Sequence, residues 1–283
     1  MRPIFIFGGD GGSRAFLSAL LAAHDACVET PQFTTRYLKA ARGSLFFDEA
    51  TFSAAPEFSL DAFSEPQAAS PEAVGQRVAA YACDHGSIDA AVWLEHVNVL
   101  ELARLDATFS EARFLHLVRD GRASTAALWQ EPGEPRRPLR ASRSWQETTL
   151  RGLEAETTLG KDRCLHVSYE TLLSDLGTGL DTLARFIGLP PEGFRIARSV
   201  LYKDYDPHLY SWRTQLTLHE IKLFETVSGA LLTDLGYGLE APGSGLPARP
   251  DVWHRAGRPP LRPNRSVSSP SPTAQDRRER WRS

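Results

Sequence analysis

The sequence predicts an α/β fold in which a P-loop-like parallel sheet is flanked by helices. Short apolar runs recur along the chain, and their length is typical of buried strands rather than helices. Segments with helical length and periodicity separate these runs, an alternation typical of doubly wound parallel sheets. Glycine or polar residues follow directly after each run, where such sheets bind their ligands.

Four runs are predicted to be strands: Ile4–Phe7, Val92–Leu94, Phe114–Val118 and Cys164–Val167. Because the carboxyl ends of parallel strands share one edge of the sheet, the residues after these runs are expected to converge on one crevice. These residues are Gly8–Arg14, Glu95–His96, Arg119–Arg122 and Ser168–Glu170. Few of them are acidic, so the crevice is expected to suit a phosphate group.

Helices are predicted between and after the strands. Ala15–Ala23 has apolar residues at positions 16, 17, 20 and 21, which form one helix face, and Val97–Phe109 and Ser144–Leu159 have the same pattern. Leu180–Ile187 is followed by Gly188 and Pro190, a typical helix stop. Thr217 and Glu220 form a T-x-x-E capping box, so a further helix is expected from there to Gly236.

With 283 residues and 31.3 kDa, the chain suits one large α/β domain or two small ones. We expect one domain over residues 1–242. Residues 243–283 are rich in Pro, Ser and Arg and lack an apolar period, so they are predicted to form a disordered basic tail. Such a tail can contact nucleic acid or an acidic partner, but its composition favours a solvated tail, and no nucleic acid is expected as a partner.

The three cysteines, Cys27, Cys83 and Cys164, are widely spaced and form no C-x-x-C motif. This pattern argues against a disulfide framework or a zinc knuckle and favours a reducing compartment, so a cytoplasmic location is expected. The apolar start, MRPIFIF, is too short for a signal-peptide core or a membrane span. Neither export nor a membrane partner is therefore expected.

The first predicted strand leads into the loop GGDGGSR and then into a helix. This order is typical of an anion cradle, because loop N–H groups and a helix N-terminus both favour negative charge. Gly9, Gly11 and Gly12 let a phosphate approach the backbone, while Ser13 can donate a hydroxyl and Arg14 a guanidinium. Taken alone, the pattern fits a tight turn without a ligand equally well.

Two common nucleotide sites do not fit this loop. A Walker A motif requires a lysine, and no Lys precedes Lys39. A dinucleotide-binding loop is paired with an acid after the second strand, a role open to Glu29, but Asp10 inside the loop would repel a pyrophosphate. Neither interpretation accounts for Arg119 and Arg122.

A second basic turn lies within the segment ARFLHLVRDGRASTAAL, which has the pattern of a strand, a turn and a helix start. Arg119 at the strand end can hold a phosphate through two parallel hydrogen bonds. Asp120 can fix that arginine or cap the next helix. An isolated Arg–Asp pair is more often structural, so this turn alone does not decide between the two.

Together these segments resemble those of sulfotransferases. FLHLVRDGRAS resembles the family's 3'-phosphate-binding segment, typically F-I-H-L-V-R-D-x-R-D, and PIFIFGGDGGSRAFLSALLAAH resembles its 5'-phosphosulfate loop. CLHVSYETLLSD with LARFIGLP, and WRTQLT with LLTDLGY, resemble later family segments in the same order. The sequences V-R-D-G-R-A-S and H-V-S-Y-E are most similar to those of protein-tyrosine sulfotransferases. The resemblance covers most of residues 3–240 and implies the sulfotransferase fold.

The resemblance also implies an activity: transfer of a sulfuryl group from 3'-phosphoadenosine 5'-phosphosulfate (PAPS) to a hydroxyl of a small molecule, a glycan or a peptidyl tyrosine. No metal is expected in this reaction. The nucleotide contacts that it implies are those of Gly9, Gly11, Gly12, Ser13, Arg14, Arg119, Ser124, Tyr169, Trp212 and Arg213. For Tyr169 and Trp212, ordinary packing is the alternative.

Three residues are expected to take part in catalysis. Glu29 resembles the acid that serves as the base in several sulfotransferases, with a solvated loop acid as the alternative. His96 is a second candidate, as base or as proton donor to the leaving group. Arg14 is expected to supply positive charge beside the leaving phosphate.

The chain also departs from the family pattern. Gly12–Phe16 replace R-S-G-T-T, so that the usual Arg is Gly and both Thr are lost, and Ala127 replaces a Ser for which Ser124 or Thr125 can substitute. A second interpretation therefore stays open, a degenerate non-catalytic nucleotide-binding or interaction protein of the same fold. A phosphate-transferring P-loop enzyme is disfavoured by the missing lysine. Residues 40–90 and 130–143, outside the motifs, are expected to shape an acceptor pocket.

Overall fold

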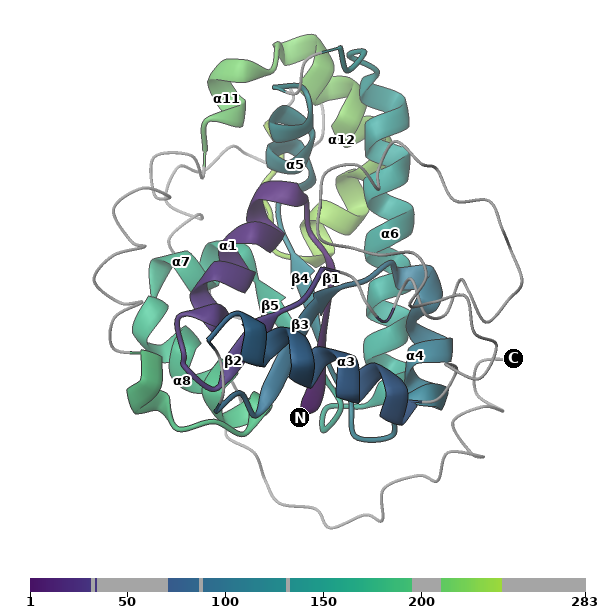
Figure 1. Cartoon of the computed structure of the whole chain (residues 1–283). Helices are drawn as coiled ribbons and strands as arrows, with labels where there is room; N and C mark the ends of the chain where they lie inside the picture. Colours follow the sequence, from purple (N-terminus) through teal and green to yellow (C-terminus); the bar gives the residue numbers. More distant parts are fainter. Residues whose placement is uncertain (32–33, 35–70, 87–88, 131–132, 195–209, 241–283) are drawn as a thin grey trace.

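The computed structural model describes residues 1–31, 34, 71–86, 89–130, 133–194 and 210–240 (Figure 1). In this part of the chain, five parallel strands form one sheet in the order β2-β3-β1-β4-β5. The strands are β1 (Arg2–Gly8), β2 (Cys27–Glu29), β3 (Val92–His96), β4 (Arg113–Val118) and β5 (Cys164–Ser168). The predicted α/β fold with a parallel sheet is confirmed, and all four predicted strands are present.

Helices cover both faces of the sheet, and the alternation of side chains along each strand explains why. Ile4 and Ile6 of β1 point into one apolar core, whereas Phe5 and Phe7 point into another. The first core is closed by α1 (Gly11–Ala22), α7 (Tyr169–Ser174) and α8 (Leu176–Ile187). The second is closed by α3 (Pro71–Asp84), α4 (Leu102–Thr108) and α6 (Pro138–Leu159), so the molecule has three layers (Figure 1).

A third, smaller apolar cluster lies beyond the carboxyl end of β4. It joins α5 (Gly121–Leu128), α11 (Trp212–Gln215) and α12 (Leu218–Asp234), which group together at the top of Figure 1. The predicted capping box of α12 is confirmed, because the Thr217 side chain accepts from the Glu220 N–H and the Glu220 side chain from the Thr217 N–H. The predicted stop of α8 at Gly188 is also confirmed, with φ of 76°.

Short 3₁₀ turns, η3 (Val99–Glu101) and η4 (Pro191–Phe194), complete the described elements. No helix among them is long and apolar enough to cross a membrane. The predicted tail, residues 243–283, lies outside the described residues, as do much of the 40–90 stretch and residues 131–132 of the predicted acceptor pocket. All three cysteines are free; Cys27 and Cys164 are buried and Cys83 is exposed.

Candidate functional site

The strand order creates a switch point between β1 and β4. From β1 the chain runs to the edge strand β2 and back to β3 on one side of β1, and then crosses to β4 and β5 on the other side. The loops that leave adjacent strands at such a point diverge and form a ligand-binding crevice. The loop after β1 and the basic turn after β4 therefore meet at the edge where the sequence predicts a phosphate site.

The side chain of Asp10 joins the loop after β1 to the turn after β4. Asp10 is the N-cap of α1, where its carboxylate accepts the Ser13 N–H at 3.0 Å. Arg119 Nη1 donates to Asp10 Oδ2 at 2.9 Å, and the Ser124 hydroxyl donates to the same oxygen at 3.0 Å. A helix N-terminus, a guanidinium and a hydroxyl thus converge on one carboxylate, and these are the groups that also bind a phosphate.

The glycines of the loop fall into two groups. Gly8 and Gly9 have positive φ, and a Cβ on either one would lie within 3.0 Å of β4 or loop atoms, so the turn itself requires them. A Cβ on Gly11 would meet no described atom within 4 Å, and one on Gly12 would meet only the Asp10 carboxylate. Because packing does not require glycine there, the exposed backbone of Gly11 and Gly12 is open to close approach by a ligand.

The Arg119 side chain is fixed by its neighbours, while its Nε–H donor has no partner among the described residues. Its guanidinium lies 4.8 Å above the ring centroid of Tyr169, and its carbonyl accepts the indole N–H of Trp145 at 3.1 Å. The Arg119 side chain is only 8% exposed, and its Nε has no hydrogen-bond partner among the described residues. Tyr169 is itself buried and packs edge-on against Phe16, so it supports the guanidinium from below.

Arg122, by contrast, uses its guanidinium to pair with two acids inside the protein. It donates from Nε and Nη2 to the two oxygens of Asp120, at 3.0 and 2.8 Å, and from Nη1 to Glu225 at 2.5 Å. Its guanidinium stacks 4.2 Å from the Trp212 ring, and both side chains are fully buried. Despite its burial, the two acids raise the pKa of Arg122 above its ordinary value, so it stays charged.

A buried acid completes this network. Glu170 accepts the backbone N–H of Asp120 and the hydroxyl of Tyr237, both at 2.9 Å. Burial raises the pKa of the Glu170 carboxyl to about 7. The network links the end of β4, the start of α7 and the segment after α12, and so fixes the turn that presents Arg119.

A second polar group lies along the same edge of the sheet, where β2 and β3 end. His96 Nε2 is 3.3 Å from Glu29 Oε1 and 2.7 Å from the Ser18 hydroxyl of α1. The Glu29 side chain is 44% exposed and that of His96 is 20% exposed, so both are accessible. The hydrogen bond from His96 lowers the pKa of Glu29 despite its partial burial, which makes Glu29 alone a weaker proton acceptor than an ordinary glutamate.

The structure therefore brings together Glu29 with His96, and Ser13, Arg119 and Ser124 around Asp10. Arg14 is partly buried on α1 and forms no ion pair with any described residue. Arg213 donates to Glu240 at 2.7 Å from Nη2. The Trp212 ring is buried in the third apolar cluster, the packing arrangement weighed as the alternative, so its role as a nucleotide contact stays a prediction.

Two residues of the site were not predicted. Asp10 was expected to repel a phosphate, but its pairing with Arg119, 109 positions away, was not foreseen. Ser18 had a signal in the sequence: it is the one polar residue in the run Phe16–Leu21 of an otherwise apolar helix face, and it is fully buried. A hydroxyl in that position needs a partner, which His96 supplies.

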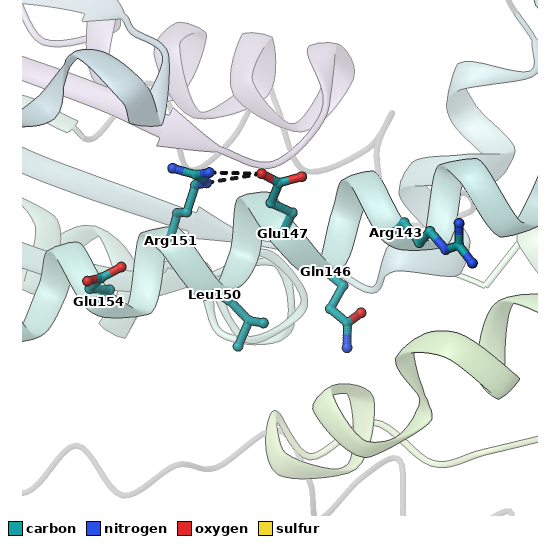
Figure 2. A pocket seen from close by; sticks show the side chains of 6 residues that line it. All are labelled: Arg143, Gln146, Glu147, Leu150, Arg151 and Glu154. Carbon is teal, nitrogen blue, oxygen red and sulfur yellow. Dashed lines mark hydrogen bonds and ion pairs between the residues drawn. The ribbon is translucent and has the colours of Figure 1, made fainter.

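A shallow hollow runs along the outer side of α6 (Figure 2). There Arg151 pairs with Glu147 at 2.9 Å, an exposed i,i+4 contact. The other lining residues are Arg143, Gln146, Leu150 and Glu154. Arg143 belongs to the stretch 130–143 that is expected to shape an acceptor pocket, but none of the predicted nucleotide-binding or catalytic residues lines this hollow.

Comparison with known proteins gives a family match. The model described as "Sulfotransferase family" matches residues 3–193. No curated protein sequence matches the chain.

Several solved structures are similar. The sulfotransferase domain of the olefin synthase from Synechococcus PCC 7002 has 22% identity and a TM-score of 0.48, over 80% of this chain and 94% of that one. A sulfotransferase from Mycobacterium avium has 15% identity and a TM-score of 0.48, over 85% and 78%. A retinol dehydratase in complex with androsterone and the inactive cofactor PAP has 14% identity and a TM-score of 0.45, over 86% and 84%.

Proposed function

Because the chain belongs to the sulfotransferase family, we propose that it transfers a sulfuryl group from PAPS to a hydroxyl acceptor. The observation that best supports this is the convergence of Arg119, Ser124 and the N-terminus of α1 on a single carboxylate at the switch point of the sheet. These groups are all hydrogen-bond donors, so they can bind an anion with several acceptor oxygens, such as a nucleotide phosphate.

In the proposed complex the two basic turns bind the two ends of the nucleotide. Arg119 and Ser124 bind the 3'-phosphate, and Tyr169 orients the guanidinium. The exposed backbone of Gly11 and Gly12, with Arg14, binds the 5'-phosphosulfate. Ser13 is buried and its hydroxyl donates to the Asp10 carbonyl at 3.1 Å, so it joins the phosphosulfate only when Asp10 moves. As the leaving phosphate gains negative charge, Arg14 stabilises it from the partly buried position that it has on α1.

The proton acceptor in this proposal is the Glu29–His96 pair. The acceptor oxygen attacks sulfur, the bond between sulfur and the 5'-phosphate oxygen breaks, and the acceptor proton moves to the pair. His96 Nε2 already contacts Glu29 and Ser18, so the imidazole is oriented at the edge of the sheet. The lowered pKa of Glu29 suits a carboxylate that stabilises a protonated imidazole, as in other His–acid pairs.

The behaviour of the Asp10 side chain on nucleotide binding distinguishes an active enzyme from the degenerate, non-catalytic alternative. Its carboxylate occupies the donors of Arg119 and Ser124, so a phosphate has to displace it from them. In the active form Asp10 swings away on binding; in a non-catalytic relative it holds the cradle closed. Acceptors of the proposed enzyme are small molecules, glycans or peptidyl tyrosine, and we propose a cytoplasmic location.

The test is thermal stabilisation by adenosine 3',5'-bisphosphate, the product nucleotide, without metal and in parallel with ATP plus Mg²⁺. At a concentration near 100 times Kd, the bisphosphate is expected to stabilise the protein by about 2.7 kcal/mol. A screen of hydroxyl acceptors with PAPS follows, with sulfation detected by mass. Stabilisation by ATP plus Mg²⁺ alone would reject the proposal.

The variant Asp10→Asn sharpens this test. Asn caps a helix as well as Asp does, so the fold is kept while the competing charge is removed. The affinity for the bisphosphate is expected to rise roughly tenfold, or about 1.4 kcal/mol. If native protein binds no bisphosphate and Asp10→Asn does, the degenerate interpretation holds. If neither binds, the phosphate site lies elsewhere.

A further inference from the structure

A cluster of two histidines and a glutamate shares no residue with the candidate site, although the His116 ring packs beside Gly8 at the start of the loop after β1. His116 of β4 and His166 of β5 are paired across the two strands, and both side chains meet Glu156 of α6. Nδ1 of each histidine contacts Oε1 of Glu156, and one ligand atom from each of the three residues lies within 4.8 Å of the other two. His116 alternates with Leu115 and Leu117 of the α1 side, so the cluster is on the α6 face of the sheet.

The His116 imidazole is locked in one orientation. One face of its ring stacks on Phe7, with centroids 4.8 Å apart and planes 2° from parallel. The ring also lies against the backbone of α6 at Gly152, where an added Cβ would be 2.2 Å from Nε2. Glycine is therefore needed at 152 to admit the ring, and Nδ1 is held toward Glu156 before any ligand binds.

The cluster is closed on one side and open on the other. The His116 side chain is 1% exposed, whereas those of Glu156 and His166 are 22% and 32% exposed. His166 is on β5, the edge strand of the sheet, so solvent reaches the cluster from that edge. An ion can enter there, and a water molecule can complete its coordination.

From this geometry we propose that His116, Glu156 and His166 bind a divalent zinc ion. Two imidazole nitrogens and one carboxylate oxygen form a typical three-residue zinc site, with water as the fourth ligand. In a tetrahedral site with bonds of 2.0–2.1 Å, ligand atoms are about 3.3 Å apart, a spacing that small side-chain movements produce here. The ion would tie edge strand β5 to β4 and α6. The three ligands are separate from the residues assigned to nucleotide binding and proton transfer.

The experiment uses the full chain, stripped with a chelator and then dialysed against micromolar zinc. Elemental analysis is expected to find one zinc per chain, and the melting temperature is expected to rise by several degrees relative to the stripped protein. Cobalt(II) in place of zinc is expected to give the visible absorption bands of a four-coordinate ion, which a non-specific surface ion would not give.

Two variants and a matched control locate the ion. His166→Ala and Glu156→Gln change partly exposed side chains, so both are expected to fold, and both should lose the bound zinc and the zinc-dependent rise in melting temperature. Glu154→Gln changes an exposed acid on the same helix and should keep both. Native protein that retains no zinc, or zinc retained equally by all three variants, would overturn the proposal and leave the cluster as a hydrogen-bonded His–Glu–His group.

Discussion

Arg119 and Arg122 are three positions apart in one turn, yet their surroundings give them opposite roles. Arg119 faces the crevice with a spare donor, whereas Arg122 neutralises two buried acids. The sequence predicts Arg119, at the strand end, as the phosphate ligand and does not assign Arg122. In the structure both side chains are buried, and their partners separate them: Arg122 pairs with Asp120 and Glu225, whereas Arg119 pairs with Asp10 of the loop after β1.

This contrast predicts different effects of the two alanine substitutions. Arg119→Ala is expected to reduce affinity for adenosine 3',5'-bisphosphate by roughly 1.5–3 kcal/mol, the contribution of a charge-assisted hydrogen bond. Arg122→Ala leaves Asp120 and Glu225 buried without their counter-ion and is expected to destabilise the fold by about 3–5 kcal/mol. Urea denaturation and calorimetric titration measure the two effects. Equal loss of binding with no loss of stability would contradict these roles.

The Glu29–His96 pair predicts a split between binding and turnover. Glu29→Gln and His96→Ala are each expected to keep bisphosphate affinity, because neither contacts the Arg119 cradle. Each should reduce turnover, by up to roughly 10²–10⁴ for the residue that takes the proton. Ser18→Ala, which removes the hydroxyl that contacts both His96 and Glu29 but neither titrating group, serves as the milder control. Normal turnover in both main variants would place the base elsewhere.

Among the elements, the long and strongly patterned ones were predictable. The predicted helix at Ser144–Leu159 extends back to Pro138, since its first turns face solvent and lack an apolar signal. β2 has three residues, too few to show a pattern, and it is defined by its pairing with β3. Glu29 and His96 are each predicted as a candidate base, but their contact, like that of Asp10 with Arg119, depends on side-chain geometry that no spacing encodes.

The junction between α7 and the segment after α12 depends on pH through Glu170. Burial raises the folded pKa to about 7, against an ordinary 4.5. Between these values the folded state keeps a proton that the unfolded chain has released, so the free energy of unfolding falls as pH rises through this window. The loss of unfolding free energy is on the order of 3 kcal/mol. It is complete above pH 7, where the acid is charged in both states, and absent below pH 4.5, where the acid is protonated in both.

Glu170→Gln tests this dependence. The amide mimics the protonated acid, so the variant is expected to gain stability relative to native protein as pH rises from 5 to 8. Urea denaturation at several pH values measures the difference between the two proteins, and the subtraction removes the contributions that they share. Glu154→Gln is the control on an exposed acid and should follow the native curve. A constant difference across the range would contradict the role of Glu170.

For the molecule as a whole, the contacts of residues 237–240 set the minimum length of the domain. Tyr237 donates to Glu170 at 2.9 Å, Glu240 N–H donates to Glu225 at 2.9 Å, and Arg213 pairs with Glu240 at 2.7 Å. These contacts tie the segment after α12 to α7 and α11. A domain that ends before residue 237 loses all of them.

Two truncated chains test the predicted domain limit. The chain 1–242 is expected to keep the native melting temperature and bisphosphate affinity, because it retains all three contacts. The chain 1–235 leaves Glu170 without its Tyr237 partner and is expected to lose at least ~1–3 kcal/mol of stability. Differential scanning calorimetry compares the two. A large loss in the chain 1–242 would show that residues 243–283 belong to the fold.

The distribution of the cysteines has a practical consequence. Burial raises the pKa of the Cys27 thiol to about 12 and that of Cys164 still higher, so neither forms the reactive thiolate at neutral pH. Cys83 is exposed on α3. A maleimide dye is therefore expected to attach at this single position in the native protein, without any engineered cysteine. The conjugate would anchor the protein to a surface in one defined orientation.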